Sequence, residues 1–261
     1  MPTGKWCCAD SYLCSMQIIP LSEGAFTIDK TKLFVPFDTE GDDLQQRPTG
    51  SLLVEVQPFA LVTADDILVI DTGLGFERGG KLQIHSNLEN AGIDPATVTK
   101  VLMSHLHKDH AGGISHIVDG ARQLSFPHAK YYVQRRELEY AFEKGPSSYH
   151  PDELECLKNS PQVVFLDGDG VLDGYISYEI TGAHCPWHQV FRIVDGGETV
   201  FFGGDVAPQL QQMKSRFVAK YDYDGKRAME LRQEWWVRGQ SEGWTFLFYH
   251  DVKTPVWPAS H

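Results

Sequence analysis

The sequence predicts an α/β fold, built as a single domain over residues 1–261. Apolar runs of strand length are interleaved with patches of helical spacing in both halves of the chain. The composition, with 42% hydrophobic and 22% charged residues, is globular and excludes disordered, collagenous and disulfide-framework proteins. A single fold of this length buries roughly three-quarters of its unfolded surface. We therefore expect a sizeable core, with residues 1–50 as a partly extended arm and loop and 32–50 as a surface loop.

In the first half of the chain, the expected elements alternate between strands and one helix. SLLVEVQ (51–57) and PFALVTADDILVIDTG (58–73) have strand character, and the second forms a hairpin that turns at Ala64-Asp65-Asp66. KLQIHSNLENAG (81–92) has helical spacing and ends at Gly92. TKVLMS (99–104) is then a short buried strand.

The second half repeats this style. AKYYV (129–133) predicts a strand and QRRELEYAFEKG (134–145) a helix. Four further strands follow, with the sequences VVF (163–165), YISYEIT (175–181), VFRIV (190–194) and TVFFG (199–203). Residues 225–243 predict a helix whose buried stripe includes Ala228, Leu231 and Trp235, and the apolar run WTFLFY (244–249) ends the core.

Charge and cysteine content narrow the classes of function. The chain has 23 Lys and Arg against 35 Asp and Glu, a formal net charge of −12, which repels nucleic acids and anionic membrane surfaces. It has neither an apolar run of about 18 residues nor a secretory signal, so we expect a soluble, cytoplasmic protein. Its five cysteines do not form a disulfide pattern; Cys7, Cys8 and Cys14 are expected to be reduced thiols, with a metal role as the alternative.

The segment SHLHKDHAGG (104–113), directly after a predicted strand, is the strongest chemical signal. It places His105, His107, Asp109 and His110 within six residues. Residues two apart in an extended stretch point to the same side, so His105 and His107 can share one ion while Asp109 and His110 reach a second. Three histidines and one carboxylate without cysteine suit zinc, manganese or iron.

Three more donors follow later strands in the same way: His184 after YISYEIT, Asp205 after TVFFGG and His250 after WTFLFY. Ligand sites of layered α/β folds gather at the carboxyl ends of strands. We therefore expect all seven donors to converge on one edge.

These motifs resemble those of the metallo-β-lactamase superfamily. HLHKDH (105–110), TGAHCPWHQ (181–189), FGGD (202–205) and FYHD (248–251) occur in the order of that family, with IDTG (70–73) upstream. The resemblance implies a metallo-hydrolase domain with an αββα sandwich fold, two mixed sheets with outer helices. It also implies a ligand set, with one ion held by His105, His107 and His184, a second by Asp109, His110 and His250, and Asp205 as the bridge.

Two neighbours of the motifs have alternative roles. His188 lies four residues after His184, and the family pattern implies a supporting residue rather than a ligand. Asp71 either caps a turn or accepts a hydrogen bond from a ligand imidazole.

The resemblance implies a dinuclear hydrolase. Two divalent ions, zinc with manganese or iron as alternatives, would hold a bridging hydroxide that attacks a lactone or similar ester, and Asp109 is the expected catalytic residue that orients it and moves its proton. Eleven residues follow His250 and 44 separate it from Asp205. We expect no glutathione-binding helical domain and no large nucleic-acid-processing insertion, so the layout is similar to N-acyl homoserine lactonases. Those enzymes carry a Tyr shortly after the bridging Asp; here Tyr221 and Tyr223 are the candidates.

Other activities remain open: a phosphotriesterase, an arylesterase, a mononuclear iron dioxygenase, or a non-catalytic metal-binding sensor. Lys108 is the only basic residue inside the motifs, which predicts a neutral small-molecule substrate beside an apolar wall that includes Phe34, Phe37 and Trp187. The sequence predicts no nucleic-acid or membrane partner and is compatible with an oligomer.

Overall fold

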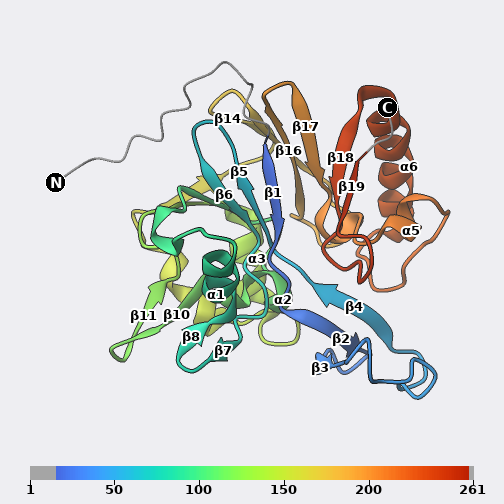
Figure 1. The fold of residues 1–261 in the computed structure, drawn as a ribbon, viewed down its shortest axis with the longest axis horizontal. Coiled ribbons are helices and arrows are strands. Elements are labelled where there is room, and N and C mark those ends of the chain that lie inside the picture. The colour runs from blue at the N-terminus through green and yellow to red at the C-terminus, as the bar shows by residue number, and fades with distance from the viewer. Residues whose placement is uncertain (1–15, 259–261) are drawn as a thin grey trace.

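The computed structural model describes residues 16–258. Two six-stranded mixed sheets pack face to face, with helices on their outer sides (Figure 1). The first sheet has the order β1 (Gln17–Pro20), β5 (Phe59–Val62), β6 (Ile67–Ile70), β9 (Lys100–Leu102), β12 (Lys130–Gln134) and β13 (Val163–Leu166). The second has the order β14 (Gly170–Leu172), β15 (Ile176–Ile180), β16 (Gln189–Asp195), β17 (Glu198–Phe202), β18 (Trp244–Leu247) and β19 (Val256–Pro258). The predicted αββα sandwich is confirmed.

The alternation of side chains along each strand divides the core into three layers. Leu68 and Ile70 of β6 point between the sheets, where they join Val200 and Phe202 of β17. Val69 of β6 instead faces the outer layer on the first sheet. Because successive strand residues point to opposite faces, each central strand is apolar on both sides.

Helices cover the two outer faces. α1 (Gln83–Asn90) and α3 (Arg135–Lys144) bury apolar side chains on the first sheet, and α6 (Gly225–Glu242) does so on the second (Figure 1). α6 buries Ala228, Leu231 and Trp235, as predicted, and is capped by Asp224, whose carboxylate accepts a hydrogen bond from the backbone N–H of Arg227. The short helices are α2 (Lys108–Ala111), α4 (Pro151–Leu154) and α5 (Leu210–Met213).

Several strands lie outside the expected set. β1 closes one edge of the first sheet, and β2 (Gly24–Ile28) joins β3 (Val35–Pro36) to the predicted strand β4 (Leu52–Val56) in a three-stranded arm that projects from the sandwich (Figure 1). The small hairpins β7 (Glu77–Arg78) with β8 (Lys81–Leu82), and β10 (Ser115–Val118) with β11 (Ala121–Leu124), were not predicted.

Tyr249 is the last buried apolar residue of the described chain, so the core ends with WTFLFY as expected, although β19 extends the second sheet beyond it. The expected loop 32–50 is exposed over most of its length, but β3 lies within it. Cys7, Cys8 and Cys14 fall outside the described residues. Among residues 16–258, no helix combines the length and apolar character that crossing a bilayer requires.

Candidate metal centre

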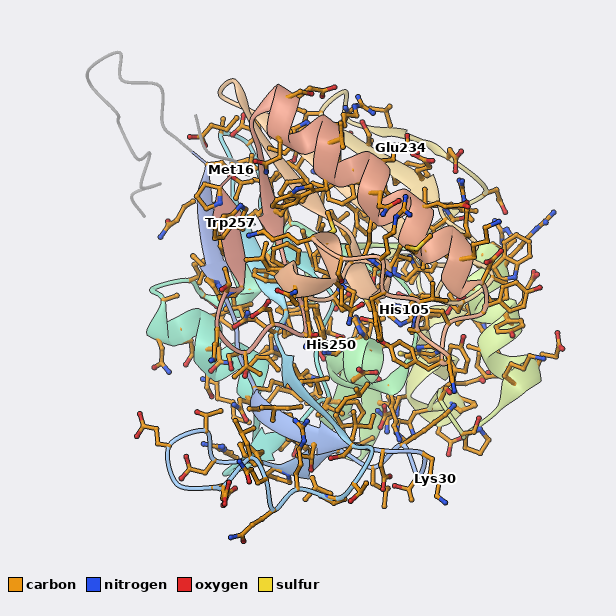
Figure 2. All side chains as sticks on the ribbon, turned by 90° about the vertical axis from the view of Figure 1, so that its right-hand side faces the viewer. Met16, Lys30, His105, Glu234, His250 and Trp257 are labelled. Atoms are coloured by element: carbon orange, nitrogen blue, oxygen red, sulfur yellow. The ribbon has the colours of Figure 1, made fainter. Side chains whose placement is uncertain are left out.

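Seven donor side chains meet at one edge of the sandwich. His105 and His107 follow β9, and Asp109 and His110 lie on α2. The second sheet supplies the other three from the segments after β15, β17 and β18, namely His184, Asp205 and His250. Parallel pairing of β6 with β9 and of β17 with β18 sends these strands toward the same edge. In Figure 2, His105 and His250 lie in the middle of the molecule, below α6.

The first donor group contains His105, His107, His184 and Asp205, whose ligand atoms all lie within 4.8 Å of one another. His107 Nδ1 is 2.9 Å from His105 Nε2 and 3.1 Å from His184 Nε2. His184 Nε2 is 3.3 Å from Asp205 Oδ2. One side of the Asp205 carboxylate therefore faces this group.

The second donor group contains Asp109, His110, His250 and again Asp205. Asp205 Oδ1 is 3.0 Å from His110 Nε2 and 3.1 Å from His250 Nε2. Asp109 Oδ2 completes the group, 3.5 Å from His250 Nε2 and 3.7 Å from His110 Nε2. The two oxygens of Asp205 thus face different groups, the arrangement a bridging carboxylate requires.

Both groups have the chemistry and spacing of divalent metal sites. Four tetrahedral ligands about 2.0–2.1 Å from zinc are separated by roughly 3.3–3.4 Å, close to the distances between these donors. His110 Nε2 and Asp205 Oδ1 are buried and lie 3.0 Å apart, yet neither has a hydrogen-bond partner among the described residues. Two unsatisfied polar atoms directed at a common point fit an ion between them.

Three of the histidines are held in place through their second ring nitrogen. His110 Nδ1 donates to Asp71 Oδ2 at 2.7 Å, and His250 Nδ1 donates to the carbonyl oxygen of Glu55 at 2.6 Å. His184 Nδ1 donates to Asp222 Oδ1 at 2.9 Å. Each bond leaves Nε2 free to face the donor group and fixes the ring orientation.

The structure decides between the two roles considered for Asp71. Its carboxylate is fully buried and accepts hydrogen bonds from His110 and from both the backbone N–H and the hydroxyl of Ser104. His188 lies outside both donor groups; its Nε2 accepts a hydrogen bond from the backbone N–H of Asp205 at 3.2 Å. Asp71 and His188 therefore hold donor residues in position through hydrogen bonds. Asp222 does the same for His184, although no sequence motif marks it.

Burial lowers the pKa values of the donor histidines, and the neighbouring carboxylates raise them. Burial lowers the pKa of His105 and of His107 well below the usual value, so both imidazoles are neutral. Burial also lowers the pKa of His110, but Asp205, Asp109 and Asp71 outweigh it and raise the pKa well above the usual value. A metal ion bound by His110 would therefore compete with a proton for this imidazole.

Two backbone segments interlock beneath the second donor group. Thr72 N–H donates to the carbonyl oxygen of His110 at 2.6 Å. A Cβ on Gly75 would lie 2.3 Å from the carbonyl oxygen of Gly112, and a Cβ on Gly113 would lie 2.2 Å from that of Thr72. Only glycine permits this approach, which joins the segment that carries Asp71 to the helix that carries His110.

A pocket of about 720 Å³ opens onto the donors and is lined by His107, Asp109, His184, Asp205 and His250. Tyr221 also lines it, whereas Tyr223 is 69% exposed and does not. Phe34 lies in the apolar wall as expected, but the expectation for Phe37 and Trp187 was wrong. Trp187 instead stacks beneath the guanidinium of Arg136, 4.8 Å from the ring centroid.

Four lysines also line this pocket: Lys30, Lys32, Lys108 and Lys220. The sequence motifs contain only Lys108. The other three come from the arm after β2 and from the segment between α5 and α6, so chain proximity alone did not reveal them.

Comparisons with known proteins identify one protein family. Residues 53–238 match the family model of the metallo-beta-lactamase superfamily. N-acyl homoserine lactonase AttM of Azorhizobium caulinodans is 35% identical over 109 residues, 39% of this chain and 38% of the relative. AttM of Rhizobium johnstonii is 49% identical over 111 residues, with the same shares covered. The matches thus span about two-fifths of the length of these curated relatives.

Solved structures match over a larger part of the chain. A probable metal-dependent hydrolase from Staphylococcus aureus superposes with a TM-score of 0.76 at 20% identity, covering 94% of this chain and 92% of the other. AidC, a dizinc quorum-quenching lactonase in complex with a product, gives a TM-score of 0.68 at 16% identity, covering 92% and 89%. At these identities, the likeness establishes the fold.

Proposed function

The chain belongs to the metallo-beta-lactamase superfamily, and we propose that it is a dinuclear metal-dependent hydrolase that opens lactones or similar esters. One observation carries the proposal: two donor groups that share Asp205 lie at a pocket large enough for a small-molecule ester. The curated relatives named as N-acyl homoserine lactonases support the choice of lactones among the possible esters.

We assign the ligands from the donor groups. His105, His107 and His184 would hold one ion, and Asp109, His110 and His250 the other, with one Asp205 oxygen on each. When bound, two divalent ions, zinc in our proposal, supply a water-derived nucleophile at neutral pH and draw electron density from the ester carbonyl. The remaining chemistry falls to the protein side chains.

Asp109 is the proposed catalytic residue. Its carboxylate lines the pocket, and its Oδ2 lies 3.5 Å from His250 Nε2. From there, Asp109 would orient the attacking water and accept its proton, which it would pass to the departing alkoxide. Tyr249 Oη donates to the backbone carbonyl oxygen of Asp109 at 2.6 Å, which fixes the start of α2.

Tyr221 is the proposed hydrogen-bond donor to the substrate. Desolvation raises the pKa of Tyr221 to about 12, against a smaller lowering by a hydrogen bond with Gln212. The phenol therefore stays protonated at neutral pH and can stabilise charge that develops on the carbonyl or leaving oxygen. Tyr221→Phe should lower kcat and leave the metal content unchanged, whereas Tyr223→Phe serves as the control.

Metal content and turnover together test the proposal. We expect about two equivalents of a divalent metal per chain and hydrolysis within a panel of lactones, aryl esters and phosphotriesters. One equivalent of iron with no hydrolysis would favour a mononuclear dioxygenase. Absence of bound metal from protein purified without chelator would favour a non-catalytic binding protein and overturn the proposal.

A further inference from the structure

The lysines of the pocket come from three separate segments. Lys30 and Lys32 follow β2, Lys108 begins α2, and Lys220 precedes α6. None of the four forms an ion pair with a described residue, whereas lysines elsewhere do. Lys100, for example, lies 3.2 Å from Asp173. The pocket therefore concentrates ammonium groups that the protein itself leaves without counter-ions.

Two of these ammonium groups are held by neutral acceptors. Lys108 Nζ donates to the backbone carbonyl oxygen of Lys32, and Lys32 Nζ donates to Ser148 Oγ at 2.5 Å. Lys32 has a left-handed backbone, with φ of 59°. These bonds link the arm to α2 without cancelling either charge. Two cations that repel each other are thus kept together at the wall of the pocket.

The carboxylates of the pocket do not balance these charges. Asp109 and Asp205 belong to the proposed metal centre, where the ions offset them. The remaining one, Asp29, accepts hydrogen bonds from the backbone N–H and the hydroxyl of Thr31. Four lysines against one carboxylate leave a local positive charge in a chain whose net charge is −12. A locally reversed charge inside a concave site attracts anions.

We propose that the substrate carries an anionic group, a carboxylate or a phosphate, that lies against Lys32 and Lys108 while its ester carbonyl faces the donor groups. This inference rests on the proposed function and replaces the neutral substrate predicted from the motifs. Leu52, Val54 and Phe217 line the same pocket and offer apolar surface to the carbon skeleton. Lysines without an arginine in the pocket lining act as point charges and accept either anion.

Three γ-lactones that differ in one substituent test the charge preference. One bears a carboxymethyl group, the second the corresponding carboxamide, and the third a phosphate in place of the carboxylate. With zinc-loaded protein at low ionic strength, kcat/KM should be at least tenfold higher for the better anionic lactone than for the carboxamide. The ratio should fall toward one as salt screens the charges. The two anionic arms identify which group the site prefers.

Lysine variants locate the source of the preference. Lys32→Gln and the double variant Lys32→Gln/Lys108→Gln should lower the ratio of anionic to amide turnover stepwise. Lys226→Gln is the matched control, because it removes the same charge from an exposed position on α6 where Lys226 pairs with Glu230. It should leave the ratio unchanged. A preference that persists in the double variant would assign it to the metal ions or to Lys30 and Lys220, and would overturn the role of Lys32 and Lys108.

Failure of the inference is distinguishable from failure of the proposed function. Equal kcat/KM for the charged and amide lactones would overturn the anionic substrate and leave lactone hydrolysis standing. Absence of hydrolysis of every lactone would overturn the function itself. In that case, calorimetric titration with the ring-opened dicarboxylate and its mono-amide still decides the inference: equal affinities contradict it, and tighter binding of the dicarboxylate that weakens in Lys32→Gln supports it.

Discussion

Replacing Asp222 by Asn removes the charge that holds the His184 imidazole. The Asp222 side chain is 1% exposed, and its Oδ1 accepts the Nδ1–H of His184 at 2.9 Å. Partners of this kind typically change metal affinity by about 10–100-fold, or about 1.4–2.8 kcal/mol. Asn keeps an acceptor oxygen but not the charge, and charge-assisted bonds are about twice as strong as neutral ones. We therefore expect about tenfold weaker zinc binding for Asp222→Asn, and a loss nearer 100-fold for Asp222→Ala.

Competition with a chromogenic zinc chelator measures this effect for each equivalent separately. Because His184 belongs to one donor group only, the affinity for one zinc equivalent should fall and the affinity for the other should stay unchanged. Asp119→Asn is the matched control: it removes one exposed carboxylate in the β10–β11 turn, where Asp119 has φ of 50°, a conformation that Asn also tolerates. Two equivalents bound with unchanged affinity in Asp222→Asn would refute the reasoning.

Three other perturbations have defined outcomes. Asp205→Ala should cost more activity than any single histidine change and lose metal by elemental analysis; two retained metals with a near-normal rate would contradict the bridging role. Zinc removal by chelation should lower the melting temperature, by the equivalent of about 2.7 kcal/mol for zinc at 100 times its Kd. Zinc affinity should also fall as the pH drops, starting above the usual histidine pKa of 6.5, because protons compete for His110, whose pKa is raised. Burial raises the pKa of Glu23 to about 7 from 4.5. The carboxyl group is therefore neutral in the folded protein at pH 4.5, and the protein loses about 3 kcal/mol of stability as the pH rises through 7. Glu23→Gln should match the wild type in urea unfolding at pH 4.5 and exceed its stability at pH 8; equal stabilities at pH 8 would contradict this.

The sandwich was predictable because its central strands are short, apolar on both faces and bounded by turn residues. Residues 199–203 illustrate this: Val200 and Phe202 face the other sheet while Phe201 faces α6. The donors were predictable for a related reason, since they follow strands of the two sheets. A chain that places His105 after β9 and Asp205 after β17 brings them together as soon as the two sheets pack.

The features that the sequence did not reveal depend on how the connecting segments run through the folded structure. Asp222 lies in a polar stretch with no motif. Backbone bonds from Tyr223 N–H to the carbonyl oxygen of His184 and from Asp224 N–H to that of Ala183 bring it to His184. Lys32 lies 76 residues before Lys108 in the chain, yet the two are hydrogen-bonded. Short edge strands such as β19, which contains Pro258, lack the apolar run that marks a central strand.

The interlock of Thr72 and Gly75 with Gly112 and Gly113 bears on how this protein can diversify. Backbone fits against backbone there, so every substitution at Gly75 or Gly113 forces the segment that carries Asp71 away from the segment that follows His110. The arm after β2 and the segment before α6 line the same pocket but bear none of the seven donors. The segment before α6 also carries Tyr221 and Asp222, so selection for a new substrate in a mutant library should enrich changes in the arm after β2 and deplete them at the two glycines. The donor groups and the arm's contribution to the substrate range lie in separate parts of the chain and can evolve at different rates.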